Sequence, residues 1–228
     1  MRKLVLFDID GTLVLTGAAG LRAMNAACED VLGRTDALAG IAVAGRTDRI
    51  ILSDVAERAG RPLDEELLIA LRDRYIPHLA REIELPGRGR KGIMPGIRPL
   101  LDALQDRDDV FLGLLTGNFE AGARIKLEHF DLWRYFRCGA FGDDAADRNA
   151  LVPFALDRAK GCGLPDLDPE HILVVGDTPH DVACARAVGA VPVAVATGSF
   201  DVAQLRATGA DIVFDDLRET GAFLSLLD

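Results

Sequence analysis

The stretch LVLFDIDGTLVLTG, Leu4–Gly17, places two aspartates at the end of a run that otherwise has the pattern of a buried strand. The run is rich in Leu and Val, as expected for a strand that is covered on both faces. Residues two apart on an extended chain point the same way, so Asp8 and Asp10 are expected to face one spot. Two close carboxylates repel each other when both are ionised. A bound cation is the simplest way to keep both ionised. Taken alone, an Asp-Gly-Thr sequence is more often an ordinary turn. Whether these acids form a functional site therefore depends on the residues at the other strand ends.

The composition is that of a globular protein. Of the 228 residues, 49% are hydrophobic and 27% are charged, which allows a sizeable core. The formal net charge of −10 argues against nucleic acid or an anionic membrane as a partner, because both would repel the chain. The first apolar run stops at Asp8, too early for a signal peptide, and no run approaches the roughly 20 apolar residues of a membrane span. We therefore expect a cytoplasmic protein.

Apolar runs of strand length alternate with segments of helical spacing along most of the chain. The runs lack the polar alternation of half-exposed strands, so helices are expected on both faces of a parallel sheet. The alternation predicts an α/β fold with a doubly wound parallel sheet. The expected strands are 3–9, 110–115, 171–176, 191–196 and 211–214, and the expected helices are 97–106, 118–130, 150–161, 179–188, 201–208 and 216–227.

The segment between the first two of these strands does not show this alternation of strands and helices. It contains no convincing strand, only helical patterns, and Gly- and Pro-rich linkers flank it at 11–20 and 86–96. We therefore predict a core domain of residues 1–16 and 91–228, with a helical domain of residues 17–90 inserted after the first strand. The expected helices of the insert are 18–32, 47–60 and 63–85, the last with Pro77 as a point of bending.

Polar residues also follow the second strand. Thr116, Gly117 and Asn118 offer a hydroxyl and free backbone N–H groups at a helix start. Such a group can hold an oxyanion or a phosphate, although an ordinary N-cap has the same pattern.

A third set of polar residues follows the strand expected at 171–176. Asp177 leaves the sheet there, and Asp181 comes in the first turn of the next helix, where an acid is also favoured by the helix dipole. Ligands of open parallel sheets bind beyond the carboxyl ends of the strands. Beside Asp8 and Asp10, Asp177 is a third carboxylate at one rim, and hard oxygen ligands in that number suit Mg²⁺.

The order of these motifs resembles the haloacid dehalogenase superfamily, whose members are mostly Mg²⁺-dependent phosphatases. DIDGT comes first, then a strand-end Thr, then a basic residue, then the GDxxxD pattern of residues 176–181. The pattern covers almost the whole chain, and the helical insert looks like the C1-type cap of that superfamily. The sequence GRTD at residues 45–48 and the overall size are similar to the phosphoglycolate phosphatase-like branch.

Carried onto this chain residue by residue, the resemblance implies a role for each acid. Asp8 is the expected nucleophile, which takes the phosphoryl group as an aspartyl-phosphate. Asp10 is expected to protonate the leaving alcohol and then to activate water. The expected ligands of Mg²⁺ are Asp8, the backbone carbonyl of Asp10, and Asp177. Asp181 is expected to contact the basic residue of the third motif and to orient it, without touching the substrate.

The resemblance also implies a grip on the phosphoryl oxygens, made by Thr116 and by the N–H of Gly117 or Asn118. The third motif of the family usually carries a Lys, whereas the stretch GDDAADRNALVP of this chain carries Arg148. Arginine keeps the positive charge and can bind phosphate through two N–H groups, but its length and geometry differ from those of lysine. Lys160 is the rival, yet the helix expected there would place it at the end remote from the rim.

The helical insert is expected to close over the site as a lid that reads the leaving group. Arg46 is the candidate for that contact, although an arginine capping a surface helix explains it equally well. The expected partner is a small phosphorylated metabolite, and the expected assembly is a monomer or a homodimer.

Other reactions stay open on this fold. Asp10 favours phosphate esters over dehalogenation, and the insert has no Lys to form the Schiff base of the phosphonatase branch. A phosphomutase would pass the same aspartyl-phosphate to a second substrate if the lid excludes water. A catalytically silent phosphate-binding protein is supported only by the change from Lys to Arg. A phosphorelay receiver shares several of the polar residues but has about half this length.

Overall fold

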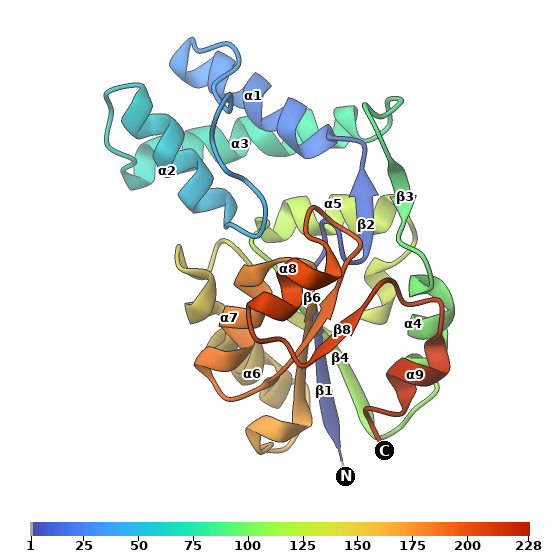
Figure 1. The fold of residues 1–228 in the computed structure, drawn as a ribbon. Helices are drawn as coiled ribbons and strands as arrows, with labels where there is room; N and C mark the ends of the chain where they lie inside the picture. The colour runs from blue at the N-terminus through green and yellow to red at the C-terminus, as the bar shows by residue number, and fades with distance from the viewer. Residues whose placement is uncertain (1) are drawn as a thin grey trace.

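The computed structural model describes residues 2–228, and a six-stranded parallel sheet runs through its centre (Figure 1). The strand order is β5-β4-β1-β6-β7-β8. The chain passes from β1 to one side through β4 and β5, and then to the other side through β6, so the order reverses at β1. This confirms the predicted doubly wound sheet and makes the carboxyl end of β1 the expected place for a ligand. The strands are β1 (Lys3–Phe7), β4 (Val110–Leu115), β5 (Cys138–Ala140), β6 (Ile172–Gly176), β7 (Val191–Val195) and β8 (Ile212–Phe214).

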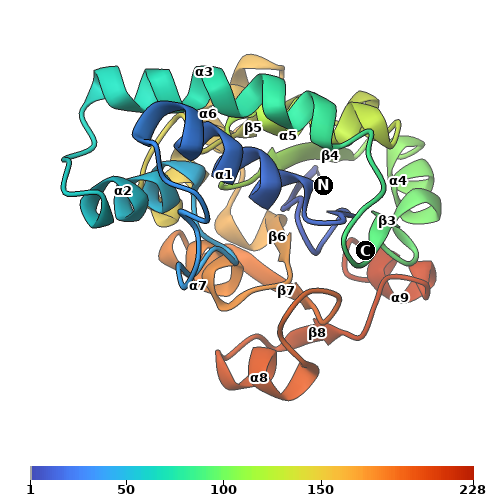
Figure 2. The same ribbon diagram turned by 90° about the horizontal axis from the view of Figure 1, so that it is seen from above.

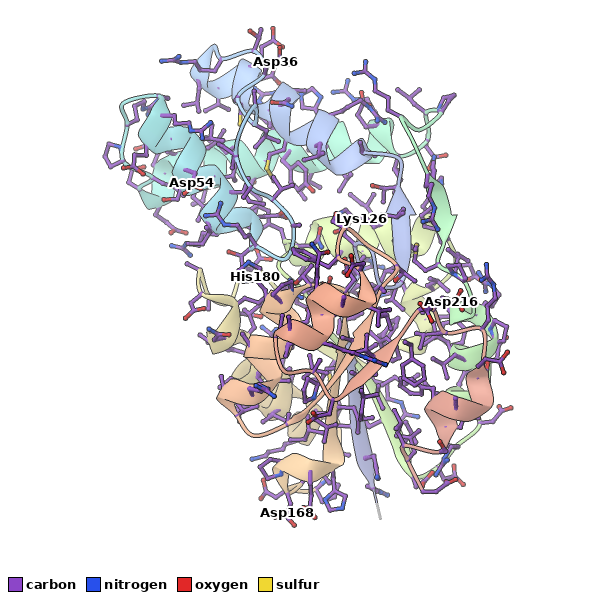
Figure 3. All side chains as sticks on the ribbon, in the orientation of Figure 1. Asp36, Asp54, Lys126, Asp168, His180 and Asp216 are labelled. Carbon is purple, nitrogen blue, oxygen red and sulfur yellow. The ribbon has the colours of Figure 1, made fainter. Side chains whose placement is uncertain are left out.

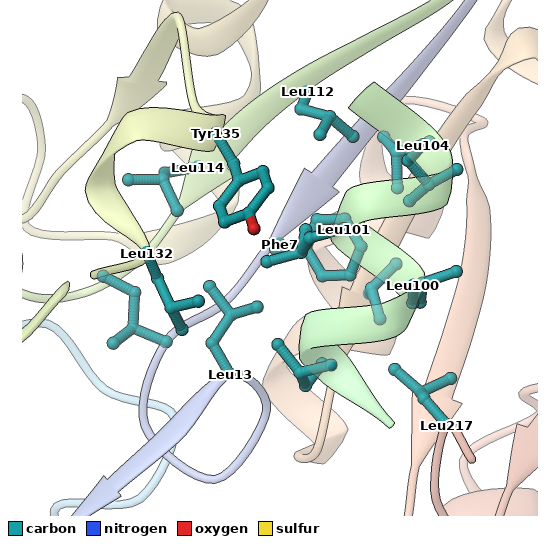
Figure 4. Packing of buried hydrophobic residues seen from close by; sticks show 14 of the residues in the cluster. Phe7, Leu13, Leu100, Leu101, Leu104, Leu112, Leu114, Leu132, Tyr135 and Leu217 are labelled. Atoms are coloured by element: carbon teal, nitrogen blue, oxygen red, sulfur yellow. The ribbon is translucent and has the colours of Figure 1, made fainter. Parts of the chain in front are cut away.

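Successive residues of β1 enter two separate apolar layers. Val5 and Phe7 pack with side chains of α4, α5 and α9, and Figure 4 shows Phe7 among the leucines of α4. Leu4 and Leu6 pack on the other face with α6 and α7. Burial on both faces explains the absence of polar alternation in this strand. The core helices are α4 (Ile97–Gln105), α5 (Glu120–His129), α6 (Leu151–Gly161), α7 (Pro179–Ala187), α8 (Val202–Ala207) and α9 (Thr220–Leu224).

Three helices form a cap over the carboxyl ends of the strands (Figures 1 and 2). They are α1 (Ala19–Leu32), α2 (Asp48–Arg58) and α3 (Glu65–Glu82), and they share an apolar cluster of their own. Pro77 lies inside α3 and does not end it. None of the described helices combines the length and the apolarity needed to cross a membrane. The exact division of the chain at residues 16/17 and 90/91 stays a prediction.

The two linkers differ from the prediction, because each contains a short strand. β2 (Val14–Thr16) and β3 (Lys91–Ile93) pair antiparallel and join the cap to the core. Three-residue strands are too short to show a periodicity in the sequence, and β5 was missed for the same reason. The helix expected at 216–227 is also shorter, since α9 has only five residues.

The first strand ends two residues earlier than the predicted range of 3–9. The amides of Thr12, Leu13 and Val14 all donate to the carbonyl of Ile9, with N···O distances of 2.9–3.3 Å. This turn takes the chain out of the sheet directly after Asp8. It therefore leaves the carboxylate of Asp8 at the sheet edge.

Candidate functional site

Three neighbouring strands deliver polar side chains to one edge of the sheet. Asp8 follows β1, Thr116 follows β4 and Asp177 follows β6, and all three residues are buried. The amide of Asp8 still donates to the carbonyl of Val175 at 2.9 Å, which fixes the backbone one residue beyond the strand. The sequence prediction that these strand ends meet is confirmed.

Carboxylate oxygens of Asp8, Asp177 and Asp181 lie within 4.8 Å of one another, and all three residues are buried. The hydroxyl of Thr12 donates to Oδ1 of Asp177 at 3.1 Å. A buried set of oxygen donors is compatible with a hard divalent cation, which would balance their charge. The third carboxylate of the set is Asp181, because the side chain of Asp10 is held by other groups.

Burial raises the pKa of two of these acids well above the ordinary value of 3.8. The pKa of Asp8 is about 6, since the desolvation caused by burial outweighs the attraction of Arg148. The pKa of Asp177 is about 8, because burial is reinforced by the negative charges of Asp181 and Asp8. Without a cation, the cluster is therefore expected to hold protons at neutral pH.

Arg148 connects the nucleophile candidate to the cap. It lies in a single 3-10 turn before α6, and its Nη2 is 2.9 Å from Oδ1 of Asp8 and 2.5 Å from Oδ1 of Asp181. Its Nη1 donates to the carbonyl of Gly45 in the cap at 3.1 Å. Its Nε is buried and has no hydrogen-bond partner among the described residues. The rival, Lys160, is an exposed residue that pairs with Asp166.

A second cation holds the side chain of Asp10. Lys126 of α5 places its Nζ 2.6 Å from Oδ2 of Asp10 and 2.5 Å from Oδ1 of Asn118, and its side chain is only 5% exposed. Asn118 donates from Nδ2 to the same Asp10 oxygen and to the hydroxyl of Thr116, both at 2.8 Å. Figure 3 labels Lys126 where α5 lies below the cap. Asp8 and Asp10 thus have different cationic partners.

Sequence reasoning missed Lys126. Asn118, Gly122 and Lys126 are spaced four residues apart, and on a helix such residues share one face. That spacing would have placed an ammonium group on the same side as the predicted phosphate-binding residues. The signal is weak, because most lysines on a helix point into solvent.

The cap is docked on the core through residues 45–48. The amide of Asp48 donates to the carbonyl of Gly117 at 2.7 Å, and Oδ2 of Asp48 accepts from the amide of Phe119 at 2.9 Å. The hydroxyl of Thr47 donates to the carbonyl of Ala146 at 2.7 Å. Burial raises the pKa of Asp48 to about 6, against the attraction of Lys126. These bonds hold the cap closed over the acids.

A cavity of about 530 Å³ lies between the cap and the acids. Asp8, Asp10 and Arg148 lie on its wall on the core side. Arg46 lies on the cap side, with Nη1 2.7 Å from Oδ2 of Asp54 and 2.9 Å from the carbonyl of Ala42. The guanidinium of Arg46 is therefore already paired within the cap.

Comparison with known proteins places this geometry in context. A family model described as a haloacid dehalogenase-like hydrolase matches residues 2–189. A phosphoglycolate phosphatase of Rhodospirillum rubrum is 32% identical, over 98% of this chain and 91% of the relative. A predicted phosphoglycolate phosphatase from Haemophilus somnus has a similar structure, with a TM-score of 0.71, 20% identity and 98% coverage of both chains. A β-phosphoglucomutase candidate from Thermotoga maritima gives a TM-score of 0.61, with 22% identity and 99% coverage of both chains.

The raised pKa values predict how the stability of the protein depends on pH. The folded state binds protons more tightly than the unfolded state at Asp8 and Asp177, so these groups cost no stability below about pH 4 and an increasing amount up to about pH 8. Thermal unfolding without divalent ions should therefore show a lower Tm at pH 8.5 than at pH 5. Mg²⁺ at about 100 times its Kd should add about 2.7 kcal/mol, or about 5–10 °C, at pH 8.5.

Asp177→Asn provides the control for this prediction, because an amide carries no charge at either pH. The variant should lose less stability than the wild type between pH 5 and pH 8.5, and Mg²⁺ should stabilise it less. If Tm changes equally with pH in the wild type and in Asp177→Asn, and Mg²⁺ raises Tm equally in both, the pH dependence does not come from Asp177.

Proposed function

Because the chain belongs to the haloacid dehalogenase-like hydrolase family, we propose that it hydrolyses phosphate monoesters of small alcohols through an aspartyl-phosphate on Asp8. The observation that carries the proposal is the position of Asp8, which lines the cavity between cap and core and sits between Arg148 and the other acids. The similarity to the Rhodospirillum rubrum enzyme supports a phosphate ester as substrate. The cytoplasmic location and the monomeric or dimeric state stay predictions.

In the proposed first step, a carboxylate oxygen of Asp8 attacks phosphorus while the bond from phosphorus to the ester oxygen breaks. Asp10 supplies the proton that the departing alkoxide needs, and in the second step it takes a proton from the water that hydrolyses the aspartyl-phosphate. A Mg²⁺ held by Asp8, Asp177 and the backbone carbonyl of Asp10 would neutralise charge between the carboxylate and the phosphate. The oxygen donors present fit this ion.

The neutral and cationic groups around the acids would hold the phosphoryl oxygens. Thr116 supplies a hydroxyl, and Gly117 and Asn118 supply the backbone N–H groups of the predicted grip. Arg148 has one buried N–H, at Nε, for which residues 2–228 offer no acceptor. Asp181 holds the same guanidinium in place at 2.5 Å.

We assign to Lys126 the role of positioning Asp10. An acid that must deliver a proton to the leaving oxygen has to be held within hydrogen-bond reach of it. The ammonium of Lys126 and the amide of Asn118 fix one Asp10 oxygen from the side of α5, and the Asp10 side chain remains 43% exposed toward the cavity.

A phosphomutase is the second candidate. The closed cap and its backbone bonds to Gly117 and Phe119 favour exclusion of water, which a mutase requires. The Thermotoga maritima structure shares the fold of this chain. A mutase would return the phosphoryl group to a second hydroxyl and release no free phosphate.

The test of the proposed function measures phosphate release from a panel of small phosphate esters, with Mg²⁺ and with a chelator. We expect release only with the metal, and a loss of at least about 10³-fold in Asp8→Asn, because the nucleophile is removed. Activity that survives in Asp8→Asn would exclude the covalent mechanism. Transfer to a sugar phosphate without free phosphate would establish the mutase instead.

Replacement of Arg148 tests its assignment as the positively charged residue of the third motif. Arg148→Ala should lower kcat/KM by about 10²–10³-fold, the size expected for loss of one group that stabilises developing charge. Lys160→Ala is the control and should stay near wild type. Since Arg148→Ala leaves buried acids without a counter-ion, Arg148→Lys is included and should keep more activity and a higher Tm. Equal losses in Lys160→Ala and Arg148→Ala would reject the assignment.

Lys126→Met tests the positioning role of Lys126. Methionine keeps the length of the side chain and removes the charge. We expect kcat to fall by about 10–100-fold, which is the usual effect of removing a residue that orients a reacting side chain, here Asp10. KM should change less. Lys126→Arg should restore part of kcat. A change in KM alone, or a loss of kcat that matches a loss of folded protein, would instead indicate a binding or structural role.

A further inference from the structure

The cavity is large and apolar for a substrate as small as phosphoglycolate. Its volume is about 530 Å³, and its cap side is lined by Leu21, Met24, Val43, Ile51 and the ring of Tyr75. Leu21 is 42% exposed, so its side chain is open to a ligand in this cavity. Apolar side chains on a cavity wall gain free energy when an apolar group replaces water beside them. This wall therefore fits a hydrocarbon part of a ligand.

The cations around the cavity fall into two groups. Arg46, Lys126 and Arg148 each contact a carboxylate of the protein. Arg88 and Arg90 also line the cavity, and neither forms an ion pair with any residue from 2 to 228. In a chain with a net charge of −10, two cations without partners on one cavity wall favour an anionic group of the ligand.

The backbone of Arg88 and Arg90 pairs with Gly17, at the outer end of the segment that leads away from Asp10. The amide of Arg88 donates to the carbonyl of Gly17, and the amide of Gly17 donates to the carbonyl of Arg90. Gly17 is three residues beyond Val14, which bridges to Asp10, so this backbone lies about 10 Å farther along the strand. In phosphoglycolate the carboxylate oxygens are four bonds, or about 5 Å, from phosphorus.

We propose that the substrate is a phosphate monoester of an amphipathic hydroxy acid, with a hydrocarbon body of about three to five carbons between the ester oxygen and a distal carboxylate. The body lies against the apolar wall formed by Leu21, Met24 and Ile51, and the carboxylate faces Arg88 and Arg90. This proposal rests on the proposed phosphatase activity and narrows its substrate class.

The experiment compares two series of phosphate esters with the same reacting group. One series carries a terminal carboxylate: phosphoglycolate, 4-phosphooxybutanoate and 6-phosphooxyhexanoate. The other series consists of ethyl, butyl and hexyl phosphate. We expect kcat/KM to be at least tenfold higher for 6-phosphooxyhexanoate than for phosphoglycolate. In the alkyl series, kcat/KM should rise by up to about fourfold for each methylene group that becomes buried.

Replacement of the arginines tests the carboxylate contact separately. In Arg88→Ala/Arg90→Ala, the ratio of kcat/KM for 6-phosphooxyhexanoate to that for hexyl phosphate should fall at least fivefold. Arg61→Ala removes an exposed cation between α2 and α3 and should keep the wild-type ratio. An unchanged ratio in the double variant, or a preference for phosphoglycolate over both longer acids, overturns the proposal while the phosphatase activity stands. Failure to hydrolyse any of the six esters would overturn the proposed function itself.

Discussion

The structure depends on the way buried negative charge is balanced at the carboxyl edge of the sheet. Carboxylate oxygens of Asp8, Asp177 and Asp181 are within 4.8 Å of one another, and among residues 2–228 the guanidinium that pairs with this set belongs to Arg148. Three ionised carboxylates and one arginine would leave two uncompensated charges in a buried place, which is costly. The raised pKa values of Asp8 and Asp177 express that cost. Either protons or a divalent cation must balance the remainder, and a site of this kind is suited to exchange one for the other.

Two separate cations contact the two acids of the DID sequence. Arg148 contacts Asp8, and Lys126 contacts Asp10 at 2.6 Å. A carboxylate that attacks phosphorus must stay ionised, whereas one that exchanges protons must be able to change its charge. In the proposed mechanism, a separate partner for each acid would meet these two requirements, although only one residue lies between them in the sequence. Both acids line one cavity, as expected, but they face it from different cationic partners.

The main features of the core were predictable because they depend on local sequence. Buried strands without polar alternation, and acids directly after them, identified the sheet, its active edge and the positions of Asp8, Thr116 and Asp177. Lys126, Asp48 and the pairing of Arg46 with Asp54 were not predictable in this way, because each contact joins segments that periodicity does not relate: α5 to the end of β1, the cap to the core, and two parts of the cap. The three-residue strands β2, β3 and β5 were missed because their pairing depends on neighbouring segments rather than on periodicity.

The geometry of Arg148 offers a reason for an arginine at this position. Its guanidinium reaches two acids through Nη2 and donates to the carbonyl of Gly45 in the cap through Nη1, while its Nε has no partner among residues 2–228. A lysine ammonium has its three donors on one nitrogen, so it cannot reach partners as widely spaced as the N–H groups of a guanidinium can. The planar group therefore joins Asp8 to the cap. Opening of the cap would remove one hydrogen bond from Arg148, and the position of the charge beside Asp8 would become sensitive to whether the cavity is closed.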